Sequence, residues 1–385
     1  MIIGVAKETA DNEHRVSMSP ETVKKLSAQD ITIQIESSAG DNASVTDDLF
    51  KDAGAKIVKT KEEAYKNADV VLAVQTSADD LDFMKKDAFY IGLVNPYQNE
   101  GLIKKAAEKN IALFAMELVP RITRAQAMDV LSSQANLAGY KAVLDATEHY
   151  ARALPMMMTA AGTVAPAKVF VMGAGVAGLQ AIATAKRLGA VVSATDVRPA
   201  AKEQVQSLGG TFVAVEDEEF KEAETAGGYA KEMSKEYQKK QAALTEEHIA
   251  KQDIVITTAL IPGRPAPKLI SEKMIKSMKP GSVIVDMAVE AGGNVALAEL
   301  GKVTEKHDVK IVGNANIPSR LAASSSSLYA KNLLNLLGLI AKGGKIDIDW
   351  DDEIVQRIAL TKDGQIIHPN FASKPKAKKT ENKEA

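Results

Sequence analysis

The chain has 385 residues, a formal net charge of −2, 45% hydrophobic and 25% charged residues, and no cysteine. The length predicts two domains with ordinary hydrophobic cores, and the near-zero charge gives no general attraction to nucleic acid. The lack of cysteine excludes disulfides, thiolate catalysis and cysteine-ligated zinc.

The five histidines are scattered along the chain without metal-ligand spacing, so no metal site is predicted. The first ten residues lack the basic segment and apolar run of a secretory signal. The apolar stretch Leu333–Ala341 is far shorter than a membrane span. We therefore expect a soluble protein of a reducing compartment.

Short β-rich runs alternate with helical patterns from the first residues onward. The predicted strands of this first series are Ile2–Ala6, Ile31–Ser37, Lys56–Thr60, Asp69–Val74, Phe89–Val94 and Ile111–Glu117. Between the first two strands, Ser19 is predicted to cap a helix that has Pro20 at its first position. Strands separated by helices predict a parallel sheet that is covered on both faces.

A long helix from Arg124 to about Leu154, ended by Pro155, separates this series from a second one. Its buried side is expected to carry Leu131, Leu137, Tyr140 and Val143. The strands predicted for the second series are Lys168–Gly173, Ala190–Asp196, Thr211–Val215, Asp253–Leu260, Ser282–Ala288 and Val309–Ala315. Another long helix, Ser324–Ala341, follows with serine as its cap.

Two long helices that frame the second series predict an insertion. We expect two doubly wound α/β domains with parallel sheets, the second a Rossmann domain inserted into the first. The first domain is expected to comprise residues 1–130 and 325–372, and the inserted domain residues 131–324. The Lys-rich tail, residues 373–385, has no hydrophobic pattern and is expected to be disordered.

The glycine motif G-x-G-x-x-G after the strand Lys168–Gly173 is the sharpest functional signal. Gly173, Gly175 and Gly178 follow an apolar strand and open a helix, and the next strand ends at Asp196. This is the βαβ context in which such a motif binds a dinucleotide pyrophosphate. A carboxylate at Asp196 accepts ribose hydroxyls and repels a 2′-phosphate, which favours NAD(H) over NADP(H); Arg198 nearby is the opposing signal.

Two further segments are candidates to close over the cofactor. Thr257–Pro267 follows a strand, so it is expected at the carboxyl edge of the sheet, where doubly wound folds bind ligands. Asp217–Gln241 is a long polar insertion in which Gly227 and Gly228 precede Tyr229. It predicts either a mobile lid with an aromatic tip or a solvated helical excursion.

Taken together, these motifs resemble the NAD(H)-binding component of proton-translocating transhydrogenase, within the alanine dehydrogenase/transhydrogenase family. The resemblance covers nearly the whole chain, and its most specific parts are "PRITRAQAMDVLSSQANLAGYKAV", "PMMMTAAGT", "GAGVAGLQAIATAKRLGA", "ATDVR", "ETAGGYAKEM" and "TTALIPG". It implies a dimeric enzyme that passes hydride from NADH to NADP⁺ held on a separate component. It also implies coupling to a membrane proton channel.

The resemblance also implies the site residues. Arg121, Gln126, Asp129 and Ser132 are expected to act beside the dihydronicotinamide as the catalytic group. The expected NAD(H) contacts are Arg121, Ile122, Thr123, Arg124, Gln126, Asp129, Ser132, Gly173, Gly175, Val176, Gly178, Asp196, Val197, Arg198, Gly228, Tyr229, Gln241 and Leu260.

Direct hydride transfer between two nicotinamides needs no general acid or base. It needs the reacting carbons held about 3–3.5 Å apart with aligned rings, so the protein contributes positioning and water exclusion. Gln126 and Asp129 would share one helix face if the helix has begun at that point. The residues alone also allow a plain helix N-terminus capped by Thr123.

Two other functions stay open. An alanine-dehydrogenase-like oxidoreductase would use Arg15 for its substrate. Its imine chemistry requires a lysine and an acid–base histidine, but Gln75 stands at the lysine position and Asn95–Asn99 contains no histidine. The third function is a non-catalytic NAD(H)-sensing module.

The resemblance further implies a homodimer that works with an NADP(H)-binding component and a membrane proton-channel component. NADP(H) would be the second substrate, on the partner. The expected location is cytoplasmic, at the inner face of the membrane through these partner subunits.

Overall fold

The computed structural model describes residues 1–223, 233–261 and 263–372. The chain forms two compact units. Unit 1 comprises Met1–Val130 and the chain from Ser326 onward, and unit 2 comprises Leu131–Ser325. The second unit is thus inserted into the first, and the two-domain α/β fold expected from the sequence is confirmed.

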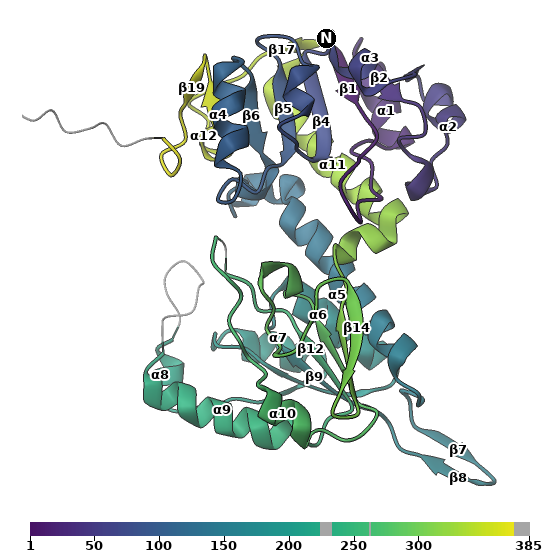
Figure 1. Ribbon diagram of the computed structural model, residues 1–385, viewed down its shortest axis with the longest axis vertical. Coiled ribbons are helices and arrows are strands. Elements are labelled where there is room, and N and C mark those ends of the chain that lie inside the picture. The colour runs from purple at the N-terminus through teal and green to yellow at the C-terminus, as the bar shows by residue number, and fades with distance from the viewer. Residues whose placement is uncertain (224–232, 262, 373–385) are drawn as a thin grey trace, which may run out of the picture. The chain divides into compact units, whose positions relative to one another are not determined.

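Unit 1 is built on a six-stranded parallel sheet in the order β3-β2-β1-β4-β5-β6 (Figure 1). Its strands are β1 Ile2–Val5, β2 Thr32–Glu36, β3 Lys56–Val58, β4 Val70–Gln75, β5 Phe89–Leu93 and β6 Ala112–Ala115. Its helices are α1 Pro20–Ser27, α2 Asp47–Asp52, α3 Lys61–Tyr65, α4 Glu100–Glu108 and α12 Glu353–Ile358. The order reverses between β1 and β4, which makes a topological switch point there.

Local sequence explains where these elements begin. Ser19 caps α1 as predicted, because its Oγ accepts the backbone N–H of Thr22 at 3.3 Å while Pro20 takes the first helical position.

Near its end the chain forms two short hairpins, β16 Ala341–Lys342 with β17 Lys345–Ile346 and β18 Thr361–Lys362 with β19 Gln365–Ile366.

Unit 2 is built on a seven-stranded sheet in the order β11-β10-β9-β12-β13-β15-β14. Its strands are β9 Lys168–Met172, β10 Val191–Thr195, β11 Thr211–Phe212, β12 Ile254–Thr257, β13 Val283–Asp286, β14 Lys302–Lys306 and β15 Val309–Gly313. All neighbours are parallel except β14, which pairs with β15 antiparallel. The order reverses between β9 and β12, as in dinucleotide-binding folds.

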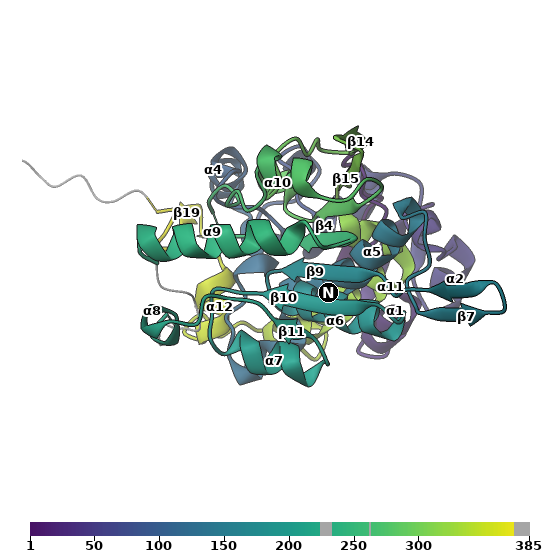
Figure 2. The same ribbon diagram turned by 90° about the horizontal axis from the view of Figure 1, so that it is seen from below.

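Helices cover both faces of the unit 2 sheet (Figure 2). They are α6 Val176–Arg187, α7 Ala201–Ser207, α8 Glu218–Lys221, α9 Lys235–Ile249 and α10 Glu272–Ser277. On one face, Val169 and Val171 pack against Ile182 of α6. On the other, Phe170 packs in the cluster that contains Ile249 of α9. Apolar residues therefore point alternately to two cores, which buries the strands on both faces.

The two long helices differ from the prediction at their starts. α5 spans Val130–His149, and the residues before it, Thr123–Met128, form a separate 3₁₀ helix. Asp129 between them has an extended backbone (φ −71°, ψ 92°), so one continuous helix from Arg124 is wrong. α11 spans Ala322–Ile340, so it begins before the serines that were expected to cap it.

The buried face of α5 also differs from the expectation. Leu131 and Tyr140, predicted to be buried, are 48% and 39% exposed. Small and polar residues occupy the buried face instead. Ala138 and Ala142 are buried with Val143, and the side chain of Asp145 is fully buried between Lys141 and Arg320. Gly139 allows a close approach to α6, since a Cβ there would lie 2.0 Å from the carbonyl oxygen of Ala177.

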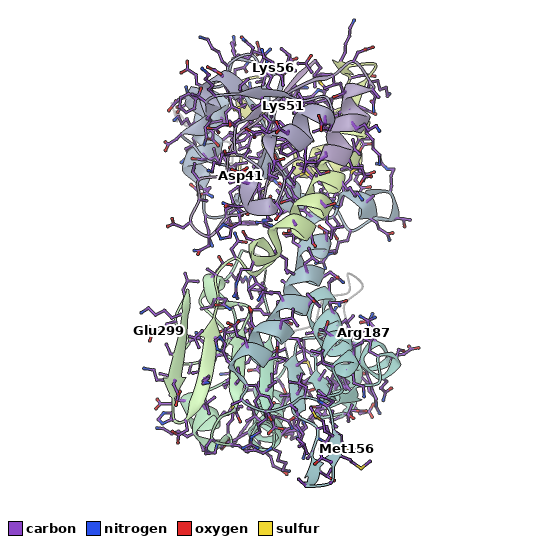
Figure 3. The ribbon with its side chains drawn as sticks, turned by 90° about the vertical axis from the view of Figure 1, so that its right-hand side faces the viewer. Asp41, Lys51, Lys56, Met156, Arg187 and Glu299 are labelled. Carbon is purple, nitrogen blue, oxygen red and sulfur yellow. The ribbon has the colours of Figure 1, made fainter. Side chains whose placement is uncertain are left out.

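A hairpin that the sequence pattern did not predict follows α5. It consists of β7 Met157–Thr159 and β8 Gly162–Val164, paired antiparallel. Every residue of the two strands is exposed, including Met158 at 77%. Figure 3 labels Met156, which immediately precedes β7. Its sequence "PMMMTAAGT" is apolar enough to suggest a core strand, yet it lies on the surface of unit 2.

Candidate functional site

The glycine turn lies at the carboxyl end of β9, next to the switch point of the unit 2 sheet. Gly173 has φ +104°, a conformation that L side chains rarely adopt. A Cβ at Gly178 would lie 1.8 Å from the carbonyl oxygen of Gly173, so only glycine lets α6 pack this close to the turn. Among the described residues, no atom lies within 4 Å of a Cβ placed at Gly175, so the backbone there is open to an approaching group.

The N-terminus of α6 adds the donors. Gly175 is its N-cap and provides no side-chain hydrogen bond, so the first N–H groups of the helix are not capped from within that residue. Uncapped N–H groups and the helix dipole together favour an anion such as a pyrophosphate. The glycine turn therefore fits the anion-binding role that the motif predicts.

Asp196 follows β10 at the same edge of the sheet. Its Oδ2 accepts the N–H of Ala174 at 2.7 Å, which ties the carboxylate to the glycine turn. Arg198 donates to both carboxylate oxygens, from Nε at 2.9 Å and from Nη2 at 3.0 Å, and its backbone N–H donates at 2.9 Å. The guanidinium of Arg198 is thus directed at Asp196. The carboxylate of Asp196 lies beside the glycine turn, which is the position expected of a ribose-binding acid.

Gln241 lies on α9 and connects two segments of this edge. Its Oε1 accepts the N–H of Val215 at 2.9 Å, and its Nε2 donates to Oγ1 of Thr195 at 3.2 Å. The sequence identified Gln241 only as a cofactor contact. In the structure its amide also fixes the segment after β11 to the end of β10.

Three apolar side chains expected at the cofactor are exposed at this edge. Val176 is 41% exposed, Val197 is 49% exposed, and Leu260, after β12, is 58% exposed. They follow three adjacent strands, β9, β10 and β12. Gly228 and Tyr229, expected in a lid, lie outside the described residues.

The segment expected beside the nicotinamide belongs to unit 1, except for Ser132, which lies in unit 2. Gln126 is exposed on the 3₁₀ helix Thr123–Met128, whose N-cap residue is Ile122. The α-helix has not yet begun at Gln126 and Asp129, so the condition for a shared α-helical face is not met, and Thr123 caps no α-helix. Arg124 pairs with Asp352 at 2.6 and 3.1 Å, which connects this segment to the N-cap of α12 within unit 1.

A buried ionic cluster in unit 1 was not predicted from the sequence. Arg15 donates to Glu13 from Nε at 2.7 Å and from Nη2 at 2.6 Å, and both side chains are almost completely buried. Gln75 donates from Nε2 to Glu13 at 3.2 Å. Glu13 stands two residues before Arg15, so the charge pairing within "NEHRV" was the available signal.

Unit 2, with its glycine turn at the switch point of the sheet, has the architecture of a dinucleotide-binding α/β domain. Comparisons with known proteins agree. The chain matches the family "Alanine dehydrogenase/PNT, N-terminal domain" over residues 4–138 and "Alanine dehydrogenase/PNT, C-terminal domain" over residues 142–369. The chain therefore belongs to the alanine dehydrogenase/PNT family, and the resemblance found in the sequence is confirmed.

Within this family the chain is more similar to transhydrogenases than to the alanine dehydrogenases compared. It is 54% identical to an NAD(P) transhydrogenase alpha-subunit chain of Rhodospirillum rubrum, covering 96% of this chain and 98% of that one. A solved transhydrogenase from Sinorhizobium meliloti matches with 56% identity and a TM-score of 0.87 over 95% of this chain and all of that one. An alanine dehydrogenase from Methanococcus maripaludis is 27% identical, covering 94% and 92%.

The comparisons and the site agree on two points. The chain is an oxidoreductase component of the transhydrogenase type, and it is an NAD(H)-binding protein. Among the described residues, no helix is both long and apolar enough to cross a membrane.

Proposed function

We propose that this chain is the NAD(H)-binding component of a proton-translocating transhydrogenase, and that it passes hydride from NADH to NADP⁺ held on a partner component. The observation that carries the proposal is the open glycine turn tied to Asp196, in a chain that is 54% identical to a transhydrogenase subunit over nearly its whole length. Bound NADH supplies the hydride, so the chain has to bind, orient and exclude water.

Unit 2 provides the nucleotide anchors. The N–H groups at the start of α6 hold the pyrophosphate, and Asp196 accepts the adenosine ribose hydroxyls. Val176, Val197 and Leu260 supply apolar contact around them, with Gly228, Tyr229 and Gln241 as further contacts. Asp196 is the residue that repels a 2′-phosphate, and Arg198 donates to both of its carboxylate oxygens. The guanidinium of Arg198 is therefore directed at Asp196 and not at a 2′-phosphate. NAD(H) is therefore the nucleotide that this chain binds.

The nicotinamide end is assigned to the segment from Arg121 to Ser132. We propose that Arg121, Gln126, Asp129 and Ser132 orient the carboxamide and ribose, with Ile122, Thr123 and Arg124 in contact beside them. Gln126 is exposed and is proposed to reach toward the second nucleotide. These residues position a donor and an acceptor, and none of them has to transfer a proton.

The buried cluster around Arg15 argues against an amino-acid oxidoreductase. A carboxylate-binding arginine must offer its N–H fork to a substrate, whereas Arg15 directs Nε and Nη2 to Glu13. Gln75 stands where the imine chemistry requires lysine, and it also donates to Glu13. We therefore assign Arg15 a structural role. A module that senses NAD(H) without catalysis is the remaining alternative, which the transfer assay tests.

The proposal includes the partners. We propose a homodimer that joins an NADP(H)-binding component and a membrane proton-channel component, with the chain at the cytoplasmic face of the membrane through these subunits. The relatives from Rhodospirillum rubrum and Rickettsia prowazekii are themselves named as portions of an alpha subunit, which describes members of a larger assembly.

A reconstituted transfer assay tests the function. The purified chain is mixed with the NADP(H)-binding component of a related transhydrogenase, NADH and an oxidised NADP⁺ analogue, and reduction of the analogue is followed. We expect transfer that requires both proteins, and we expect Gln126→Asn to slow it while NADH affinity changes little. The exposed Gln356 on α12 provides the matched control, Gln356→Asn.

Each alternative gives a different result in this assay. NADH binding without any transfer would favour the sensing module. Steady reduction of NAD⁺ by L-alanine, with this chain alone, would favour the amino-acid oxidoreductase.

A further inference from the structure

The loop Ala259–Pro267, which the structure describes except for Pro262, follows β12 at the carboxyl edge of the unit 2 sheet. It carries two exposed large apolar side chains, Leu260 at 58% and Ile261 at 45%. Thr258, just before it, donates from Oγ1 to the carbonyl oxygen of Gly173 at 3.1 Å. The start of the loop is thus hydrogen-bonded to the glycine turn. The conformation of the loop determines which groups Leu260 contacts.

One side chain holds both ends of this loop. The amide nitrogen of Asn294 donates to the carbonyl oxygen of Ala259 at 2.9 Å and to that of Pro267 at 2.8 Å. Its Oδ1 accepts the N–H of Ala259 at 3.1 Å. Asn294 is fully buried, and both of its N–H groups are used. A replacement that lacks a donor would leave a backbone carbonyl without its partner.

Asn294 is held in place by the strand beside β12. Asp286, the last residue of β13, is fully buried and accepts the N–H of Asn294 at 3.2 Å. It also accepts the N–H groups of Ala288 and Val295, each at 3.0 Å. A continuous series of hydrogen bonds therefore runs from the end of β13 through Asn294 to the loop that presents Leu260.

We propose that Asn294 is a positioning residue for the nicotinamide nucleotide. Asn294 connects Ala259 to Pro267 at the two ends of the loop, so that Leu260 is held against the bound nucleotide. Asn294 itself does not contact the nucleotide. The inference rests on the proposed function to the extent that unit 2 binds NADH.

The substitution Asn294→Asp tests this positioning role, because it keeps the shape of the side chain and removes its N–H donors to Ala259 and Pro267. An ionised carboxylate would face two carbonyl oxygens, whereas the protonated form restores one donor. Burial raises the pKa of the introduced carboxyl, and Asp286 nearby adds to this rise. We expect NADH affinity to fall about 10-fold or more at pH 9, the effect of an unpaired buried carbonyl. The affinity should recover toward the wild-type value as the pH is lowered to about 6.

Ser282→Ala is the matched control. Ser282 lies just before β13, at the opposite edge of the same sheet, and donates from a buried Oγ to the carbonyl oxygen of Gln252 at 3.3 Å. Its loss should lower the thermal midpoint of unfolding without changing NADH affinity. NADH dissociation constants are measured by NADH fluorescence between pH 6 and 9, next to thermal midpoints for each variant.

The outcomes are distinct. An Asn294→Asp protein that is folded and binds NADH as the wild type does at every pH would overturn the inference. So would an equal loss of affinity in Ser282→Ala, because stability alone would then explain it. If Asn294→Asp does not fold, Leu260→Ala is the deciding variant. Wild-type NADH affinity in Leu260→Ala would show that Leu260 is not needed against the nucleotide, and it would overturn the inference. Failure of the wild type to bind NADH would instead refute the proposed function.

Discussion

At the scale of the residue, Asp196 accepts four hydrogen bonds, one from Ala174 and three from Arg198. A carboxylate has about four acceptor positions, so a ribose that binds Asp196 has to share or replace some of these bonds. The side chain of Arg198 is 30% exposed and that of Asp196 is 7% exposed, so Arg198 is the partner that is more accessible from outside. We therefore propose that nucleotide choice depends on Asp196 and Arg198 together.

We predict that Asp196→Asn weakens NADH binding about tenfold and strengthens NADPH binding, because Arg198 loses its carboxylate and becomes available to a 2′-phosphate. Dissociation constants for both nucleotides, measured by fluorescence, check this. In the double variant Asp196→Asn, Arg198→Met the gain for NADPH should disappear. Asp253→Asn, at the amino edge of the sheet, is the control. Unchanged discrimination in Asp196→Asn would show that another group selects the nucleotide.

At the scale of the element, the apolar pattern predicted the parallel strands of both sheets, because strands buried between two helical layers form short apolar runs. It failed at the start of α5. "RITRAQAMDV" has helical composition, but Asp129 is extended and Arg124 is directed to Asp352, far along the chain. Such a long-range pairing leaves no mark in the local pattern.

The exposed strands were missed because their composition is misleading. β7 and β8 carry methionines that resemble a core, and β14 carries polar residues, "KVTEK", that resemble a loop. Composition does not report strand pairing, and in β7 and β8 it does not report burial either, since these apolar residues are exposed. For the candidate site, the sequence predicted the nucleotide anchors but not Asn294, whose role depends on backbone atoms that the fold brings together. It also did not predict Glu13, although the nearby Arg15 was an available signal.

The start of α6 yields an element-scale prediction from two glycines of one motif. Gly178→Ala would force a Cβ against the backbone of Gly173, so the free energy of unfolding should fall by about 2 kcal/mol or more. Gly175→Ala meets no atom, so stability should be retained. Its methyl group occupies the approach of the pyrophosphate, so NADH affinity should fall about tenfold, equivalent to about 1.4 kcal/mol.

Urea unfolding and NADH titration of the two variants separate these effects. If Gly175→Ala bound NADH like the wild type, the turn would not be the pyrophosphate site.

At the scale of the whole molecule, nucleotide anchors and acidic groups are divided between the units. The proposed pyrophosphate and ribose anchors lie in unit 2, whereas unit 1 holds acidic side chains at the switch point of its own sheet. Among them Asp80 is buried and Glu8 is partly buried. Glu8 lines a cavity of about 140 Å³ there, together with Lys61, Gln75 and Asp80. Its carboxylate accepts the N–H of Val74 at 2.6 Å and that of Gln75 at 3.3 Å.

Burial raises the pKa of Glu8 to about 8, and the charges of Glu13 and Asp80 contribute to the rise. Below pH 4.5 the carboxyl group is protonated in both the folded and the unfolded chain. Between pH 4.5 and about 8 it is protonated only in the folded chain, so folding binds a proton. Stability therefore falls as the pH rises through this window and changes little from this cause above it.

We predict that Glu8→Gln removes this contribution to the pH dependence, because its amide stays neutral. One unit of pKa shift corresponds to about 1.4 kcal/mol. The free energy of unfolding of Glu8→Gln, relative to the wild type, should thus increase by at least about 1–2 kcal/mol between pH 5 and 9. Urea unfolding at pH 5, 7 and 9 measures it, with the exposed Glu62→Gln on α3 as control. Parallel pH profiles for the wild type and Glu8→Gln would mean that Glu8 is already ionised in the folded protein at pH 5, with its charge balanced by Lys61 and the two backbone N–H groups.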